Sequence, residues 1–294
     1  MAEQPPGPAS PPRSTASAAG RLLGFVAPTG LLTGIFYYFG YVSARSFYGY
    51  FGIPLSALGL PASHYFIQTT DTVFRPLAII AVIALSILVL HQLVDVRAPT
   101  LARRTARTIH RGLVMVSIVL AAVGLVGLYT GKGGALCAAS LAAAAVLAEY
   151  SLWLGLRTGM LSALVATLAT ARAEIRRGIL LAVVVVAVFW GVTDLAHDRG
   201  LERARIIEST LPFQPQAVVY SVQELSIPGT GVQMQRLPAA EGGAIYLYNG
   251  LRPLVYAHDR WFLLPKGWKR GNGDTVVLVR DTSDHVRVDL APGK

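Results

Sequence analysis

The sequence predicts an α-helical transmembrane bundle of five helices, followed by a small antiparallel β barrel or sandwich domain. Three observations lead to this prediction: five long apolar stretches, arginine-rich connections between them, and a polar region at 198–294 with alternating hydrophobic residues. The composition is 53% hydrophobic and 14% charged, with a mean hydropathy of +0.50. Soluble domains average roughly 25% charged residues. We therefore expect the bilayer to surround most of the chain.

Each apolar stretch has the length of one membrane crossing, since about 20 helical residues cover the roughly 30 Å hydrocarbon core. Within a transmembrane domain at 21–197, the predicted helices cover about 22–44, 76–95, 112–131, 133–156 and 178–196. The last helix reaches Ala196 if Asp194 extends to the headgroups. A further apolar patch at 160–171 is too short to cross, so an amphipathic helix or a helix extension at the cytoplasmic surface is predicted there.

Basic residues next to a membrane segment resist translocation, so their distribution predicts the orientation. One side of the predicted bundle carries eleven arginines: Arg13, Arg21, Arg97, Arg103, Arg104, Arg107, Arg111, Arg157, Arg172, Arg176 and Arg177. The other side carries three basic residues: Arg45, Arg75 and Lys132. We therefore expect a multipass plasma-membrane protein with a cytoplasmic N-terminus and an extracytoplasmic C-terminal domain. Topology and attraction to anionic lipid account for the net charge of +10, and no nucleic-acid partner is expected.

The first twenty residues are rich in proline, serine and alanine, a composition that predicts a disordered cytoplasmic tail at 1–20. The first apolar stretch has an alternative interpretation as a cleaved signal, because Val42-Ser43-Ala44 resembles a small-residue cleavage sequence. A retained anchor suits its length and its rings better.

Nine aromatic residues fall within the sixteen positions from Phe36 to Phe51. Rings with one polar end favour the headgroup level of a bilayer, so an aromatic belt at the outer end of the first helix is predicted. The alternative is a platform for a ligand or lipid. Gly30 and Gly34 form a G-x-x-x-G face lower in the same helix, which leaves a homo-oligomer open as a hypothesis.

Glu149 is the one ionisable residue predicted to lie deep in the membrane, about 12 Å of helix before Arg157. A partner on another helix or a water is expected, with Tyr150 and Trp153 as neighbouring hydrogen-bond donors. His91 and Asp95, four residues apart at the cytoplasmic end of the second helix, are weaker candidates. Three such groups do not establish a proton or ion relay, so structural pairing is favoured over transport or catalysis.

The outer domain, 198–294, begins with a polar helix that Pro212 should end. About seven short strands follow, and the Asn249-Gly250 pair predicts a tight hairpin turn, with Pro253 indicating an edge strand. His258 and His285 have no partner at metal-ligand spacing, and Cys137 is the single cysteine. We therefore expect no catalytic, cofactor or metal site.

Short patterns spread over most of the chain from Leu22 resemble uncharacterised actinomycete multipass membrane proteins. In the helical part they are Tyr37-Tyr38-Phe39-Gly40, Tyr48-Gly49-Tyr50-Phe51-Gly52, Tyr65 and Asp71. In the outer part they are Leu211-Pro212, Val218-Val219-Tyr220-Ser221, Tyr248-x-Gly250-Leu251-Arg252 and Phe262-Leu263-Leu264-Pro265. The resemblance implies an aromatic and glycine-rich first segment and a small C-terminal extracytoplasmic β domain. It implies no site residues.

Two functions are compatible with these features. The first is a non-enzymatic anchor or interaction protein of the cell envelope, which presents its β domain to a partner protein, a lipid or a wall polymer. The alternative is a small transporter or channel-like protein in which Glu149 is the working ionisable group.

Overall fold

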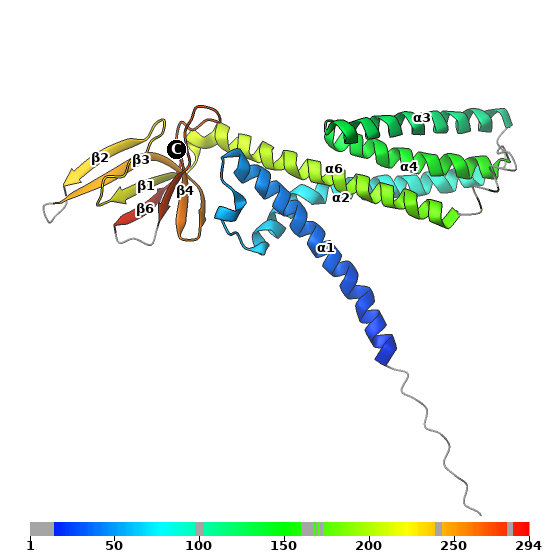
Figure 1. Ribbon diagram of the computed structural model, residues 1–294, viewed down its shortest axis with the longest axis horizontal. Helices are drawn as coiled ribbons and strands as arrows, with labels where there is room; N and C mark the ends of the chain where they lie inside the picture. Colours follow the sequence, from blue (N-terminus) through cyan, green and yellow to red (C-terminus); the bar gives the residue numbers. More distant parts are fainter. Residues whose placement is uncertain are drawn as a thin grey trace, which may run out of the picture.

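The computed structural model describes residues 15–97, 103–159, 167, 170, 173–238, 243–280 and 285–293, with side chains of the first helix from Gly30 onward. Five long helices form one end of the molecule and a β-sheet forms the other (Figure 1). The helices are α1 (Thr15–Tyr50), α2 (Ala62–Arg97), α3 (Arg103–Thr130), α4 (Gly134–Arg157) and α6 (Ala173–Thr210). Two short 3₁₀ helices, η1 (Leu55–Ala57) and η3 (Leu211–Phe213), adjoin α1 and α6.

Four of these helices are long and apolar enough to cross a membrane. The corresponding spans are Pro76–Val96, Arg104–Thr130, Gly134–Arg157 and Ala173–Phe213, and they match four of the five predicted crossings to within one residue or extend beyond them. The remaining prediction, 22–44, lies within α1 and stays a prediction. Residues 15–20 of the predicted disordered tail are helical at the start of α1, and most of the predicted amphipathic segment 160–171 lies outside the described residues.

Small residues let the helices approach each other closely at several points. A Cβ on Gly200 of α6 would overlap the carbonyl oxygen of Ser43 in α1, and one on Gly40 would overlap that of Tyr65 in α2. Around Gly30 and Gly34, in contrast, no atom lies within 4 Å of an added Cβ. In this chain, therefore, the close helix contacts use other glycines than the predicted G-x-x-x-G face, and a homo-oligomer through that face stays a hypothesis.

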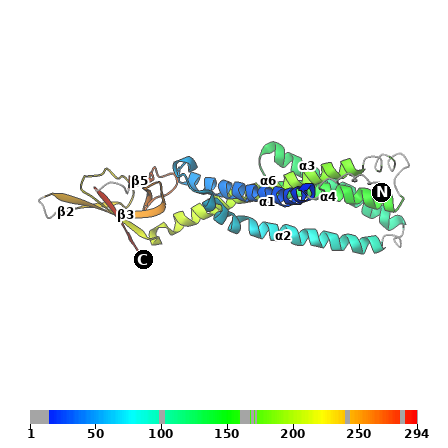
Figure 2. The same cartoon turned by 90° about the horizontal axis from the view of Figure 1, so that it is seen from below.

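Helix α2 runs along one side of the helical part (Figure 2), and no residue in its most apolar window is buried. Its contact with α1 is concentrated near the β-sheet, where the Thr69 hydroxyl donates to the Phe36 carbonyl at 2.6 Å. A helix that is apolar and unburied along most of its length is expected to face lipid.

The C-terminal domain contains one six-stranded antiparallel sheet. Its strands are β1 (Gln216–Ser221), β2 (Gln233–Pro238), β3 (Ala244–Ala257), β4 (Arg260–Pro265), β5 (Val277–Arg280) and β6 (Val286–Ala291). The order is β5-β4-β3-β1-β6, with β2 paired to the first half of β3. The antiparallel pairing is confirmed, but no pairing between β5 and β6 closes the sheet in the described residues, so the barrel or sandwich stays a prediction.

The predicted hairpin at Asn249-Gly250 is wrong. Both residues lie inside the long strand β3, and the positive φ of Gly250 (85°) belongs to an irregularity where a Cβ would overlap the Gly231 carbonyl oxygen. The chain reverses instead at His258 and Asp259, whose φ values of 50° and 54° form a tight turn between β3 and β4. Pro253 lies in the second half of β3, where β4 pairs with it and β1 no longer does, so one side of this half of the strand is open although β3 as a whole is a central strand.

A continuous hydrophobic core joins the helices to the sheet. Its buried residues come from α1 and the turn after it, the start of α2, α6, η3 and the sheet: Ala44, Phe47, Tyr48, Tyr50, Phe51, Ile53, Leu58, Tyr65, Ala204, Leu211, Ala257, Phe262, Leu264 and Trp268. We call this set the junction core. Each large side chain buried in it stabilises the fold by about 1.5–3 kcal/mol.

The predicted aromatic belt is accordingly wrong for the second half of the aromatic segment. Phe47 and Phe51 are 7% and 4% exposed, and the Phe51 and Trp268 rings lie 5.0 Å apart. Tyr37 and Tyr38, nearer the membrane helices, remain about 40% exposed. The rings thus bind the first helix to the β domain.

Substituting Gly200 by alanine tests whether the α1–α6 contact holds the molecule together. The added methyl group cannot fit beside the Ser43 carbonyl without moving a helix, so we expect a loss of about 1–3 kcal/mol. Thermal unfolding of the purified protein in micelles measures it. Gly34→Ala, with open space around the new methyl, should unfold at the wild-type temperature or higher. Equal unfolding temperatures for the two variants would contradict the close contact.

Candidate functional site

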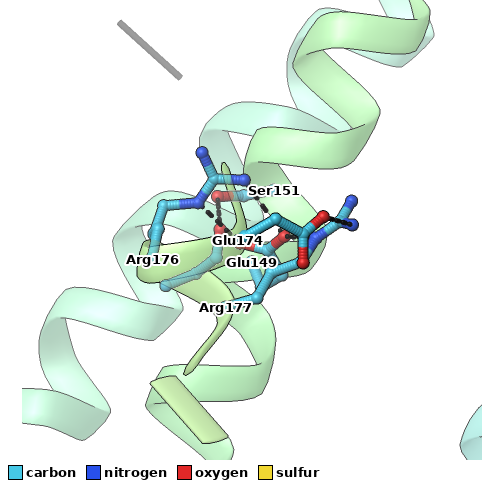
Figure 3. A network of polar contacts seen from close by, with 6 residues as sticks. Glu149, Ser151, Glu174, Arg176 and Arg177 are labelled. Atoms are coloured by element: carbon cyan, nitrogen blue, oxygen red, sulfur yellow. Dashed lines mark hydrogen bonds and ion pairs between the residues drawn. The ribbon is translucent and has the colours of Figure 1, made fainter. Parts of the chain in front are cut away.

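The carboxylate of Glu149, on α4, is held by two arginines of α6 (Figure 3). Arg176 donates from Nε to Oε2 at 2.9 Å and from Nη2 to Oε1 at 3.1 Å, a two-point contact. Arg177 donates from Nε to Oε1 at 3.1 Å. The Glu149 and Arg176 side chains are 26% and 24% exposed, whereas Arg177 is 58% exposed. The Glu149–Arg176 pair is therefore the shielded part of the cluster.

Chain geometry explains this pairing. Helix α4 ends at Arg157 and α6 begins at Ala173, and the two run antiparallel, so two turns before the end of α4 lie beside the first turn of α6. Arg176 and Arg177 are successive residues about 100° apart around the helix, which lets them approach the carboxylate from two sides. The partner on another helix expected for Glu149 is thus this arginine pair.

The weaker candidates, His91 and Asp95, lie together on α2 and face a different side of α4. Asp95 pairs with Arg157 at 3.1 Å, with both side chains about half exposed. The His91 ring meets the Trp153 and Tyr150 rings edge-on, with centroids 4.7 Å and 6.0 Å apart. In the described part of the chain, no hydrogen bond or ion pair joins these residues to Glu149.

Tyr150 and Trp153 do not supply the hydrogen bond to Glu149 that the sequence suggested. Their rings make edge-on contacts with His91, and the buried Tyr150 hydroxyl has no hydrogen-bond partner among the described residues. Sequence reasoning also missed His110 of α3, whose Nδ1 lies 2.9 Å from the Ser151 carbonyl oxygen. The last turns of α4 therefore contact α2, α3 and α6 at once.

The other end of α4 is also fixed by a carboxylate of α6. Asp194 Oδ2 accepts the Ala135 backbone N–H at 2.9 Å, so it caps the N-terminus of α4. Seventeen residues separate Arg177 from Asp194 along α6, about 26 Å of helix. This length is close to the roughly 30 Å hydrocarbon core, so the polar ties flank an apolar stretch of one membrane thickness.

The chemistry available to this cluster is limited by its charges. Protonating Glu149 would remove the negative charge that faces Arg176 and one of the two carboxylates beside Arg177, which is also 4.0 Å from Glu174, and this loss is costly in a partly buried site. No group of three His, Cys, Asp or Glu side chains suited to a metal occurs among the described residues. The arrangement is suited to fixing α4 against α6.

A cavity of about 390 Å³ lies in the β domain, between the segment after β1 and strand β5. Its lining includes Leu225, Ile227, Val277 and Val279, with Arg280 as the one ionisable side chain. His258 lies instead at the β3–β4 turn, with its ring against Gly59. In the described lining, therefore, no pair of groups is placed for acid–base or nucleophilic chemistry.

The chain matches no protein-family model, no curated protein and no solved structure.

The arginine contacts predict an order of stability among glutamine variants. Arg176→Gln removes a shielded two-point contact and should destabilise the protein by about 1–2 kcal/mol, whereas Arg177→Gln removes an exposed contact and should cost about 0–1 kcal/mol. Glu149→Gln removes the charged partner that both arginines share, although Arg177 keeps Glu174 at 4.0 Å, and should cost at least as much as Arg176→Gln. Chemical unfolding in micelles measures these differences. A larger loss for Arg177→Gln than for Arg176→Gln would contradict the assignment.

Proposed function

We propose that this protein is a non-enzymatic anchor and interaction protein of the cell envelope. Its helices hold the small β domain in one orientation on the extracytoplasmic face of the plasma membrane, with the N-terminus in the cytoplasm. The observation that carries the proposal is the junction core, which makes the domain continuous with α1 and α6. A flexibly tethered domain would not need buried aromatic residues at its point of attachment.

Polar contacts around the junction core support a fixed orientation. The Tyr50 hydroxyl donates to the Glu208 carboxylate, and the Arg270 backbone N–H donates to the other oxygen of the same carboxylate at 2.9 Å. The Arg270 guanidinium lies 4.6 Å from the centre of the Tyr50 ring. Three segments, from α1, α6 and the turn after β4, therefore meet at one carboxylate.

Arg252 of β3 supplies a second polar link between helix and sheet. It is 6% exposed and donates to the carbonyl oxygens of Leu211 and Pro212, at 3.2 Å and 3.0 Å, just beyond the end of α6. A cation at a helix C-terminus is favoured by the helix dipole. Burial lowers the pKa of Arg252 from its ordinary value, because the charged guanidinium loses contact with water inside the junction. The lowered pKa reflects the electrostatic cost of keeping this charged group buried. The cost is compatible with a link that serves orientation.

The alternative function is a small transporter or channel-like protein that uses Glu149. A carboxylate in an apolar helix favours this alternative. Its pairing with Arg176 and Arg177 argues against it, because a transported proton or cation would have to displace both guanidinium groups. We therefore favour the anchor.

The Tyr50–Glu208 contact predicts a pH dependence of stability. The hydrogen bond to Glu208, with a smaller contribution from burial, raises the pKa of the Tyr50 phenol above its ordinary value of 10.0. A pKa raised by folding stabilises the protein fully below the unfolded value and loses this effect as pH rises through the folded value. Tyr50→Phe should therefore cost about 1–2 kcal/mol near neutral pH, and less above about pH 10.

Thermal unfolding of both proteins between pH 7 and pH 11 measures this convergence. Tyr129→Phe is the matched control, since Tyr129 is 93% exposed and its loss should change stability little at any pH. If the difference in unfolding temperature between Tyr50→Phe and the wild type stays constant up to pH 11, the Tyr50–Glu208 hydrogen bond is contradicted.

Photo-crosslinking in intact cells tests the proposed function. A photoreactive residue replaces Gln235, exposed in β2, and in a control replaces Val119, exposed on α3. We expect adducts with an envelope protein or wall polymer from position 235 alone, in the wild type and in Glu149→Gln. Ion and proton flux through reconstituted vesicles should be the same for both proteins. A folded Glu149→Gln protein that loses a wild-type flux would support the transporter instead.

A further inference from the structure

Helix α3 has two faces with different neighbours. One face packs against α4: Ala106 is 1% exposed, the Ser117 hydroxyl donates to the Ala144 carbonyl at 3.0 Å, and Gly127 approaches Cys137 closely. In Figure 1, α4 lies between α3 and the rest of the helices, so α3 is at the periphery. The face turned away from α4 is therefore open to the surrounding bilayer.

Three arginines occupy the first turns of this open face. Arg104, Arg107 and Arg111 are exposed, and their spacing of three and four residues places them on one strip of the helix. Ala106 and Ser117 lie about half a turn away, toward α4. The strip is therefore a single positively charged surface.

The charge of this strip is not neutralised within the described residues. No ion pair there involves Arg104, Arg107 or Arg111, whereas Arg157, Arg176 and Arg177 each pair with a carboxylate. Of the six arginines with described side chains on the predicted cytoplasmic side, these three carry the free charge. An anion from outside the chain is the partner with complementary charge.

Below the arginines, the same strip becomes apolar. Met115, Ile118 and Leu125 are 63%, 59% and 56% exposed and continue the helical spacing. They lie four, seven and fourteen residues after Arg111, about 6, 10 and 21 Å further along the helix. The strip thus has arginines at one end and exposed apolar side chains along the rest of its length. This arrangement is complementary to a molecule with an anionic headgroup and hydrocarbon chains.

We propose that the outer face of α3 is a binding site for an anionic phospholipid. Arg104, Arg107 and Arg111 contact the phosphate-bearing headgroup, and Met115 and Ile118 lie along an acyl chain. Lipid is favoured over a soluble anion because the arginine strip is continuous with an exposed apolar surface of the membrane span Arg104–Thr130. The site is independent of the proposed role of the β domain.

Native mass spectrometry of the full chain, released from detergent micelles, tests this site. The probes are phosphatidylglycerol, which is anionic, and phosphatidylcholine, which is zwitterionic, each titrated onto delipidated protein. The wild type should prefer phosphatidylglycerol. The triple variant R104Q/R107Q/R111Q should bind phosphatidylglycerol on the order of 100-fold more weakly, with binding of phosphatidylcholine little changed.

The matched control is R236Q/R260Q/R280Q, which removes three exposed arginines of the β domain and the same total charge. It should bind phosphatidylglycerol like the wild type. The proposal is overturned if the triple α3 variant retains wild-type affinity, or if the control loses as much. It is also overturned if glycerol phosphate displaces the lipid at equal concentration, since a headgroup anion would then suffice without its chains.

Discussion

The close approach of α1 and α6 is the contact on which the remaining structure depends. Gly200 lets the α6 backbone reach the Ser43 carbonyl, and Ala196 and Ala204, one turn to either side, are fully buried. Because no side chain separates the two helices here, the aromatic rings that follow on α1 are brought over the end of α6 and onto β4. The junction core is thus a consequence of small residues placed one turn before large ones.

A second constraint acts inside the membrane part. Helix α4 is tied to α6 at both ends, by Asp194 at its N-terminus and by Glu149 near its C-terminus. These ties differ in kind, since Asp194 accepts one backbone N–H while Glu149 pairs with two guanidinium groups. Both hold polar groups that would be costly to leave unpaired near hydrocarbon, so sliding α4 along α6 would cost more than the loss of apolar contacts alone.

Composition was sufficient to predict four of the membrane-length helices and the antiparallel outer sheet, because hydropathy and alternation are local properties of the sequence. The wrong predictions arise where one local sequence pattern is compatible with two different structures. Gly250 needs a positive φ in either a hairpin turn or a strand irregularity, and the nearby Gly231 backbone decides between them. Aromatic residues suit a headgroup belt or a buried junction equally well, and only the fold places Trp268 beside Phe51.

At the candidate site, the sequence likewise predicts the charged residues but not which of them pair. Glu149 was recognisable as an isolated intramembrane carboxylate, but its partners had been interpreted as topology signals, because a count of arginines treats all of them alike. The fold separates them: Arg157, Arg176 and Arg177 are paired within the chain, while Arg104, Arg107 and Arg111 are not. The orientation stays a prediction from the sequence, where eight arginines remain against three basic residues once the three paired ones are set aside. Among the described arginines of these connections, three therefore join helices and three have no ion pair with a described residue.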